Sequence, residues 1–402
     1  MMRNMSQRIQ KLKQYIRISL DFGCEILKSA VLYPVGRLLY RNKNVWLISE
    51  RGTDARDNGY HFFRYLREKH PEIECYYVIT RDSPDKSRVA SLGETVVYRS
   101  LRHYLLLFGA KYLISSHFMG FTTNRDFYMY IQPKMAKKAI RGKNVFLQHG
   151  IIKDNMIGFY QENTKLDLFI CGAKPEYDYI EKNWHYKHHE VQYTGLARFD
   201  ALNAIQTKRQ ILIMPTWRRW LRSAADSKKA MLESRYFKCW CSLLKSGRLA
   251  ALAEAHGVQF IFYPHHEVQK YIRSFQTASP NIILADFAHY DVQQLLKDSM
   301  LLITDYSSVF FDFAYMEKPV LYYQFDEDEF RAQHYGEGYF DYRRDGFGEV
   351  VTEERTLLDL IEAYLAKGCG LKEAYAKRID SFFPLHDGNN CERIYHQIMK
   401  LK

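Results

Sequence analysis

Short apolar runs alternate with helical stretches from residue 45 onward. Each run is nearly continuously apolar and rich in β-branched and aromatic residues, as expected for parallel strands that are covered on both faces. The first set of predicted strands comprises residues 45–49, 75–80, 95–98, 112–115, 145–148, 168–171 and 191–194. The helical patterns between them cover residues 58–69, 101–110, 133–141 and 174–183. This alternation predicts a parallel, doubly wound α/β sheet.

A second array of the same kind follows a polar stretch at residues 200–209. Its predicted strands are residues 211–214, 260–263, 282–285, 301–304, 320–323 and 350–351, and its helical patterns cover residues 228–256, 291–298 and 307–317. Two successive arrays predict two Rossmann-like domains, residues 45–207 and 208–385, that face each other across a cleft. The last segment, residues 386–402, contains an amphipathic helical pattern that can pack on either domain.

The first 44 residues form a basic, amphipathic segment. They carry nine basic and two acidic side chains, which supply +7 of the chain's formal charge of +12. The apolar positions at helical spacing are Ile9, Leu12, Ile16, Leu20 and Leu27. The basic positions largely off that stripe are Arg8, Lys11 and Lys13. Such a helix can lie in the interface of an anionic membrane, or it can pack its stripe on the protein. We expect the first arrangement, as peripheral association with the cytoplasmic face of the cell membrane.

Composition narrows the class of protein. A chain of 402 residues that is 47% apolar can bury two cores, which excludes global disorder. Its seven cysteines are scattered and odd in number, so we expect no disulfide framework and a reducing compartment. There is no run of 18 apolar residues, no convincing secretory signal and no P-loop sequence. The positive charge is not accompanied by a recognised nucleic-acid motif, so we expect no nucleic-acid partner.

The most informative segment is LLITDYSSVFFDFAYMEKPVLYY, residues 301–323, which reads as strand, turn, helix and strand. Asp305 or Ser307 suits the N-cap of the helix, and Ser307 and Ser308 fall in its first turn. A helix start after a parallel strand offers unpaired N–H groups and the positive end of a dipole, which bind phosphate readily. The alternative is ordinary capping with no ligand.

The segment NVFLQHGIIKD, residues 144–154, ends a predicted strand at His149, and Gly150 frees the chain to turn. Side chains at the carboxyl ends of parallel strands face the ligand crevice. Because histidine titrates near working pH, His149 is a candidate general base. A histidine at a strand end can also be purely structural.

Two further predicted strands are followed by candidate residues. The run ILIMPTWR ends at Arg218, whose planar guanidinium suits phosphate, although a solvated charged loop is the alternative. The run FIFYPHHE places His265 just past its strand. His265, His266 and Glu267 are adjacent and do not easily converge on one ion, so we expect no metal site there.

Taken together, these segments resemble the CDP-glycerol glycerophosphotransferase family, which includes teichoic acid primases and polymerases and related capsule enzymes. The resemblance covers about residues 45–395, and the TDYSS and PTWR runs are its most specific parts. The matching runs, in the family's order, are NVWLISERGTDARDNGYHFFRYL, FLQHGIIKD, TGLARFDAL, ILIMPTWR, FYPHHE, LLITDYSSVFFDFAYMEKPVLYYQFD, GYFDYRRDGFGEVVTEE and HDGNNCERI. The resemblance implies a GT-B architecture with the active site between the two domains. It also implies a transfer that needs no metal and no cofactor.

The resemblance further implies roles for individual residues. His149 matches the family's general base, and His265 matches a histidine near the donor pyrophosphate. The residues that it implies, or that lie in matching runs and are expected to bind substrate, are Arg218, Asp305, Ser307, Ser308, Asp312, Gly150 and Arg198.

The function implied is transfer of glycerol phosphate or ribitol phosphate from a CDP-polyol, with release of CMP. The acceptor would be a hydroxyl of a lipid-linked, teichoic-acid-like or capsular polymer, received by the 45–207 domain while the 208–385 domain holds CDP. Many family members read HGTPLK where this chain reads HGIIKD, which leaves polyol and acceptor open. The alternatives are a GT-B glycosyltransferase that uses a nucleotide sugar, and a non-catalytic protein that binds membrane or nucleic acid. The number of units added and the oligomeric state also stay open.

Overall fold

The computed structural model describes residues 2–131, 133–202, 207–223, 227–333 and 336–401. The side chains of residues 2–17 lie outside this description, and so do residues 203–206 of the predicted joint. The predicted apolar positions Ile9, Leu12 and Ile16 therefore belong to the part whose side chains are not described.

The first domain is built on a parallel sheet. Among the described residues it has seven strands in the order β3-β2-β1-β4-β5-β6-β7. The strands are β1 (Trp46–Ser49), β2 (Cys75–Ile79), β3 (Thr95–Val97), β4 (Tyr112–Ser115), β5 (Lys143–Phe146), β6 (Leu168–Cys171) and β7 (Val191–Tyr193). Ile48 in β1 is paired in register with Tyr77 on one side and with Ile114 on the other. The strand order thus reverses at β1, and the carboxyl ends of β1 and β4 form the expected ligand crevice.

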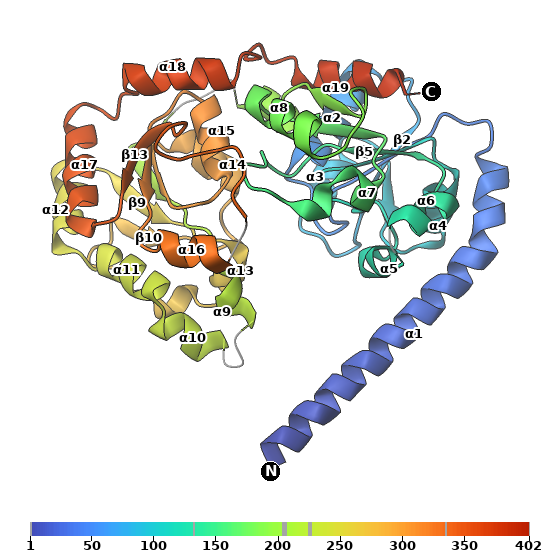
Figure 1. Cartoon of the computed structure of the whole chain (residues 1–402), viewed down its shortest axis with the longest axis horizontal. Coiled ribbons are helices and arrows are strands. Elements are labelled where there is room, and N and C mark those ends of the chain that lie inside the picture. Colours follow the sequence, from blue (N-terminus) through green and yellow to red (C-terminus); the bar gives the residue numbers. More distant parts are fainter. Residues whose placement is uncertain (1, 132, 203–206, 224–226, 334–335, 402) are drawn as a thin grey trace.

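Helices cover both faces of this sheet (Figure 1). The helices of this half of the chain are α1 (Met2–Leu39), α2 (Asn58–Lys69), α3 (Lys86–Ala90), α4 (Leu101–Gly109), α5 (Arg125–Tyr130), α6 (Pro133–Ala139), α7 (Gln161–Thr164) and α8 (Lys174–Asn183), with the short 3-10 turns η1 (Ile157–Phe159) and η2 (Ala197–Ala201).

The second domain repeats the architecture. In the described part of the chain, its parallel sheet has six strands in the order β10-β9-β8-β11-β12-β13. The strands are β8 (Gln210–Ile213), β9 (Gln259–Phe262), β10 (Ile282–Leu284), β11 (Leu301–Thr304), β12 (Val320–Tyr323) and β13 (Gly348–Val351). The order reverses at β8, so this sheet also has a crevice, at the ends of β8 and β11.

The helices of the second half are short. They are α9 (Arg219–Ser223), α10 (Ser227–Glu233), α11 (Arg235–Leu244), α12 (Gly247–Ala255), α13 (His266–Gln269), α14 (Val292–Asp298), α15 (Val309–Tyr315), α16 (Glu327–Gln333), α17 (Glu354–Ala366), α18 (Glu373–Phe382) and α19 (Asn390–Met399), with the 3-10 turn η3 (Ile272–Ser274). The helix predicted over residues 228–256 is divided in three. Ser234 and Ser246 start new helices, because each hydroxyl accepts the N–H three residues on.

The last helix, α19, packs on the first domain. Its apolar residues Cys391, Ile394 and Ile398 belong to the same core cluster as Trp46 of β1 and Phe62 of α2. Figure 1 shows α18 lying over the second domain and α19 over the first. The chain therefore crosses between the domains twice, and the second crossing completes the core of the first domain.

Helix α1 packs on the first domain through a face that carries both acidic side chains and the aromatic rings of Phe22 and Tyr33. The buried carboxylate of Glu25 accepts hydrogen bonds from the Tyr104 hydroxyl (2.7 Å) and from Thr123. One turn earlier, Asp21 accepts a hydrogen bond from Asn124 (2.7 Å). The N-terminal part of the helix extends away from both domains (Figure 1).

The apolar stripe of α1 lies on the opposite face. Leu20 and Leu27 are 66% and 67% exposed, and Val31 and Leu38 continue the stripe at helical spacing and are also exposed. In the described part of the stripe, the apolar side chains thus point away from the protein. No helix among the described residues has the length and hydropathy of a membrane span.

Candidate active site

A cleft of about 520 Å³ lies between the two domains, at the carboxyl ends of both sheets. The first domain contributes residues that follow β1, β4 and β5, and the second contributes residues that follow β8, β9 and β11. These strands lie at or beside the point where each sheet reverses its order, which is where doubly wound folds bind ligands. The sequence-predicted site residues that line the cleft are His149, Gly150, Arg198, His265, Ser307, Ser308 and Asp312.

The turn that carries His149 is fixed by a buried carboxylate in α8. Gln148 has a left-handed φ of +62°, and its side-chain amide donates to Glu176 (3.0 Å). The same carboxylate accepts the backbone N–H of Ile152 on the far side of the turn (2.6 Å). Burial raises the pKa of Glu176 to about 7. The backbone on both sides of His149 is therefore held while its ring projects into the cleft.

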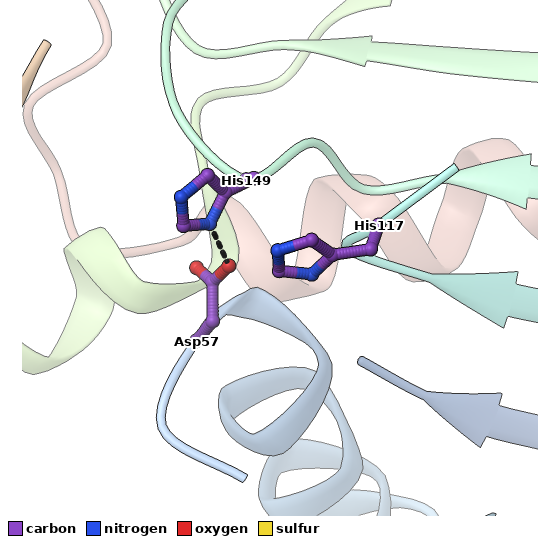
Figure 2. A group of neighbouring side chains, drawn as sticks. All are labelled: Asp57, His117 and His149. Carbon is purple, nitrogen blue, oxygen red and sulfur yellow. Dashed lines mark hydrogen bonds and ion pairs between the residues drawn. The ribbon is translucent and has the colours of Figure 1, made fainter. Parts of the chain in front are cut away.

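His149 is paired with a carboxylate that precedes α2 (Figure 2). Its Nδ1 lies 2.8 Å from Oδ2 of Asp57, and the ring of His117 lies beside it with a centroid separation of 4.5 Å. Burial disfavours the charge of Asp57, but His149 and Arg198 outweigh it and hold the pKa of Asp57 below its usual range. Burial, and then the neighbouring His149, lower the pKa of His117 well below its ordinary value, so His117 is neutral near pH 7.

Arg198, predicted to bind substrate, lines the cleft, but its guanidinium is hydrogen-bonded to other groups of the protein. Nε and Nη2 bind the carboxylate of Asp312 (2.5 and 2.8 Å), and Nη1 donates to Oδ1 of Asp57 and to the carbonyl oxygen of His149 (both 2.9 Å). Asp312 lies in α15 of the second domain, so this arginine joins the two domains beside the candidate base. Its donors are used in a fork geometry that only arginine provides.

Asp57, His117 and His149 are also the group of described side chains that could together hold a metal ion. One ligand atom from each lies within 4.8 Å of the others. Two imidazoles and a carboxylate suit zinc or a similar ion. However, Asp57 already forms an ion pair with the guanidinium of Arg198. The positive charge of that guanidinium would repel a metal ion bound beside it.

The two domains meet at the start of α15. A Cβ on Gly150 would lie 3.3 Å from Oγ of Ser308, which is tighter than ordinary contact, so the turn after His149 passes directly against this serine. Ser308 occupies the N-cap position of α15 without a side-chain cap bond, and the Ser307 hydroxyl accepts the N–H of Val309 (3.4 Å). The candidate base and the two candidate phosphate ligands therefore share one narrow part of the cleft.

His265 lies on the second-domain side of the cleft, at the end of β9. Its Nδ1 accepts the backbone N–H of Glu267 (3.3 Å), so the ring also caps α13. The imidazole is stacked on Trp217, with a centroid separation of 5.9 Å. This arrangement fixes the ring plane at the cleft wall.

Arg218, expected to bind phosphate, and Asp305, expected to bind substrate, do not line the cleft. The Arg218 side chain is fully buried and forms ion pairs with Asp305 (2.9 Å) and Asp326 (2.8 Å). Burial disfavours the charge of the guanidinium, but the two carboxylates outweigh this effect and raise the pKa of Arg218 above its usual range. Asp305 in turn accepts the N–H of Thr216 (2.8 Å), so this cluster fixes the loops after β8 and β11 that form the wall of the cleft.

Asp57 and His117, the two side chains around His149, are not among the site residues predicted from the sequence. His117 follows β4 as His149 follows β5, so the strand-end rule that selected His149 could also have found it. Asp57 lies in a loop beyond β1, and the only signal in its sequence is that of the N-cap of α2.

The fold and the cleft define a two-domain α/β protein of the GT-B kind, and structural comparison confirms this predicted class. The chain is similar to a structure of the wall teichoic acid polymerase TagF, with a TM-score of 0.62 and 19% identity, over 96% of this chain and 97% of that one. A structure of a His-to-Asn variant of TagF with CDPG is similar to the same degree, with a TM-score of 0.63.

The chain belongs to the CDP-Glycerol:Poly(glycerophosphate) glycerophosphotransferase family, whose model matches residues 32–400. The expected family is therefore confirmed. The chain is 34% identical to the minor teichoic acid biosynthesis protein GgaB of Bacillus subtilis (strain 168), over 90% of this chain and 40% of that protein. It is 22% identical to a teichoic acid glycerol-phosphate transferase of Staphylococcus aureus (strain NCTC 8325 / PS 47), over 92% of this chain and 97% of that protein. The chain thus spans about two fifths of GgaB and nearly all of the S. aureus transferase.

Proposed function

We propose that this chain transfers a polyol phosphate from CDP-glycerol or CDP-ribitol to a hydroxyl group of a teichoic-acid-like or capsular polymer, releasing CMP. The observation that carries the proposal is that His149 of the first domain and Ser307, Ser308 and His265 of the second line one cleft. Membership of the glycerophosphotransferase family and the reported TagF structure with CDPG support the choice of donor.

In this mechanism the acceptor hydroxyl approaches from the first domain, and Nε2 of His149 accepts its proton. The freed oxygen forms a bond to the β-phosphorus of the CDP-polyol, and the bond from that phosphorus to the bridging oxygen breaks, so that CMP leaves with the electron pair. The hydroxyls of Ser307 and Ser308 and the ring of His265 would donate to the phosphate oxygens on which charge develops. We expect no cofactor and no metal ion, as the resemblance to the family implies.

The first-domain wall suits an anionic acceptor. Arg51, Arg56 and Arg125 line the cleft on this side. Arg51 and Arg56 are paired with Asp54 and Asp85, while Arg125 is exposed and binds only a carbonyl oxygen among the contacts described for its side chain. A polyol-phosphate chain carries phosphodiesters that such guanidinium groups bind well. The guanidinium of Arg125 therefore favours an acceptor that already bears phosphate.

We further propose that α1 lies on the cytoplasmic leaflet of the cell membrane and brings the cleft to a lipid-linked acceptor. The exposed stripe through Leu20, Leu27, Val31 and Leu38 supports this orientation, because α1 contacts the protein with its other face. The charge of +7 over the first 44 residues adds attraction to anionic lipids, at roughly 1 kcal/mol for each basic residue near the surface.

The donor is tested by incubating the purified chain with CDP-glycerol, CDP-ribitol or a UDP-sugar, in each case with membranes that carry teichoic acid. Release of CMP together with a product heavier by one or more polyol-phosphate units is the expected result. His188→Ala is the matched control for replacement of the candidate base His149 by alanine, because His188 is exposed and is paired with Glu181 outside the cleft. Release of a nucleoside diphosphate from the UDP-sugar alone would contradict the proposal and favour a glycosyltransferase.

A further inference from the structure

The two oxygens of the Asp57 carboxylate serve different partners. Oδ2 lies 2.8 Å from Nδ1 of His149, and Oδ1 lies 2.9 Å from Nη1 of Arg198. The Asp57 side chain is only 13% exposed, whereas that of His149 is 66% exposed. The carboxylate is therefore fixed behind the ring, and the other nitrogen of the ring, Nε2, points away from Asp57 (Figure 2).

The residue next to Asp57 fixes the backbone of the same site. The Asn58 amide donates to the carbonyl oxygen of Gln148 (2.8 Å), and its Oδ1 accepts the backbone N–H of Arg198 (2.9 Å). The N–H of Asp57 itself is bound by the buried carboxylate of Glu50 (2.8 Å). The start of α2, the turn before His149 and η2 are thus locked to one another.

This network continues into the second domain. Arg198 binds Asp57 with one edge and Asp312 of α15 with the other, and both carboxylates are largely buried. A chain of alternating charges therefore runs from α15, the helix that begins beside Ser308, to the imidazole of His149. Charged groups in such a buried, fully paired chain have little freedom to move.

We propose that Asp57 is the positioning residue of His149. Its carboxylate accepts the Nδ1–H, so that Nε2 carries the free electron pair and faces the acceptor hydroxyl. Arg198 and Asp312 hold this carboxylate in a fixed position relative to α15, the helix next to the donor. The inference rests on the proposed function, in which His149 is the base. When Nε2 takes the proton, the imidazolium lies against an ionised carboxylate, which stabilises the charge that forms.

Among the groups around the His149 ring, Asp57 is the one that places a negative charge next to it. His117 is held neutral by its burial, and Arg198 faces Asp57 with the same nitrogen that binds the carbonyl oxygen of His149. Behind them, burial and then the charges of Asp57 and Asp54 raise the pKa of Glu50 to about 8. Removing the charge of Asp57 should therefore be felt directly by His149.

The test is Asp57→Asn in the full chain. Asparagine caps a helix as well as aspartate and still offers an oxygen to Arg198, so the start of α2 should stay folded. Its amide would donate to Nδ1 and force the proton onto Nε2, the wrong tautomer for a base. We expect kcat to fall by about 10²–10⁴-fold while KM for the CDP-polyol is unchanged. The acid limb of the residual kcat/KM profile should move to lower pH, because protonation of the ring loses its neighbouring negative charge.

The matched control is Glu181→Gln, which removes the carboxylate from the exposed His188–Glu181 pair and should change neither kcat nor the pH profile. If Asp57→Asn keeps wild-type kcat and an unmoved acid limb, the positioning role is wrong. Nitrogen-15 NMR of the His149 ring provides a readout that does not need turnover. The wild type should show the Nδ1–H tautomer and Asp57→Asn the Nε2–H tautomer, and the same tautomer in both would overturn the inference. Absence of CMP release from the wild type with every donor would instead overturn the proposed function.

Discussion

Arg218 lies between Asp305 and Asp326 with no exposed side-chain surface, and its guanidinium also faces the rings of Tyr236 and Tyr306. A cation in this position compensates two buried carboxylates that would otherwise be in like-charge contact. Its contribution is therefore to the stability of the second domain and to the shape of the cleft wall, and it reaches the donor only through that wall.

Replacing Arg218 by alanine should lower the free energy of unfolding by about 3–5 kcal/mol, because it leaves buried carboxylates without a partner. Urea unfolding measures this change. Arg248→Ala is the control, since Arg248 pairs with Asp359 and Glu362 on the surface, where ion pairs add little to stability. Unchanged stability of Arg218→Ala combined with lost binding of CDP would instead support a direct phosphate ligand.

Gly150 separates the candidate base from the second domain. A methyl group at this position would meet Oγ of Ser308 at 3.3 Å and displace either the serine or the turn after His149. Gly150→Ala should therefore raise KM for the CDP-polyol more than it lowers stability. Steady-state kinetics and thermal unfolding distinguish the two effects. Gly158→Ala, where a Cβ would meet nothing within 4 Å, should leave both KM and stability as in the wild type; a normal KM for Gly150→Ala would contradict the close approach at Ser308.

For individual residues, the sequence indicates a site by their place at strand ends, and this rule placed His149 and His265 at the cleft. It does not reveal where a side chain finds its partner. Arg198 and Arg218 are both predicted to bind substrate, but the carboxylates that bind them, Asp312 and Asp326, lie more than a hundred residues further along the chain.

Among the elements, α1 departs most from the usual arrangement of an amphipathic helix. Its polar residues Asp21 and Glu25 face the protein, where Tyr104, Thr123 and Asn124 satisfy them. Leu20, Leu27 and Leu38 face outward, whereas Leu32 packs on the first domain. The sequence shows the stripe but not its direction, because a stripe that packs on a protein and one that lies on a membrane have the same spacing. The strands, in contrast, are predicted well, since continuous apolar runs of this length leave little choice in an α/β array.

Replacing Leu20, Leu27 and Val31 together by serine should weaken binding to vesicles that contain anionic lipid. Each substitution removes on the order of 1.5–3 kcal/mol of apolar transfer if the side chain is fully inserted, so the loss should exceed about tenfold. Vesicle sedimentation measures binding, and thermal unfolding should be unchanged because these residues are exposed. Ile26→Ser, an exposed position on another side of the helix, is the control. Undiminished vesicle binding by the triple variant would contradict the membrane orientation.

For the whole molecule, the domains are joined by more than the connection near residue 207. The ion pair of Arg198 with Asp312, the β-bridge of Asn155 with Gly336 and the return of α19 to the first domain all tie the two halves together. Asp200 fixes this return by accepting the N–H groups of Asn390 and Cys391 (2.9 and 2.8 Å). None of these links is visible in the sequence, which shows two arrays and an amphipathic last helix but not the side on which that helix packs. The cleft geometry is a property of the assembled pair.

In the proposed mechanism, His149 of one domain acts on a donor held by the other. The most direct measurement is CMP release by His149→Ala, made alongside the dissociation constant of the CDP-polyol and thermal unfolding. The expected result is a loss of about 10²–10⁴-fold in CMP release with both other quantities unchanged, because the general base acts only in the chemical step. CMP release by His149→Ala at the wild-type rate would contradict this mechanism.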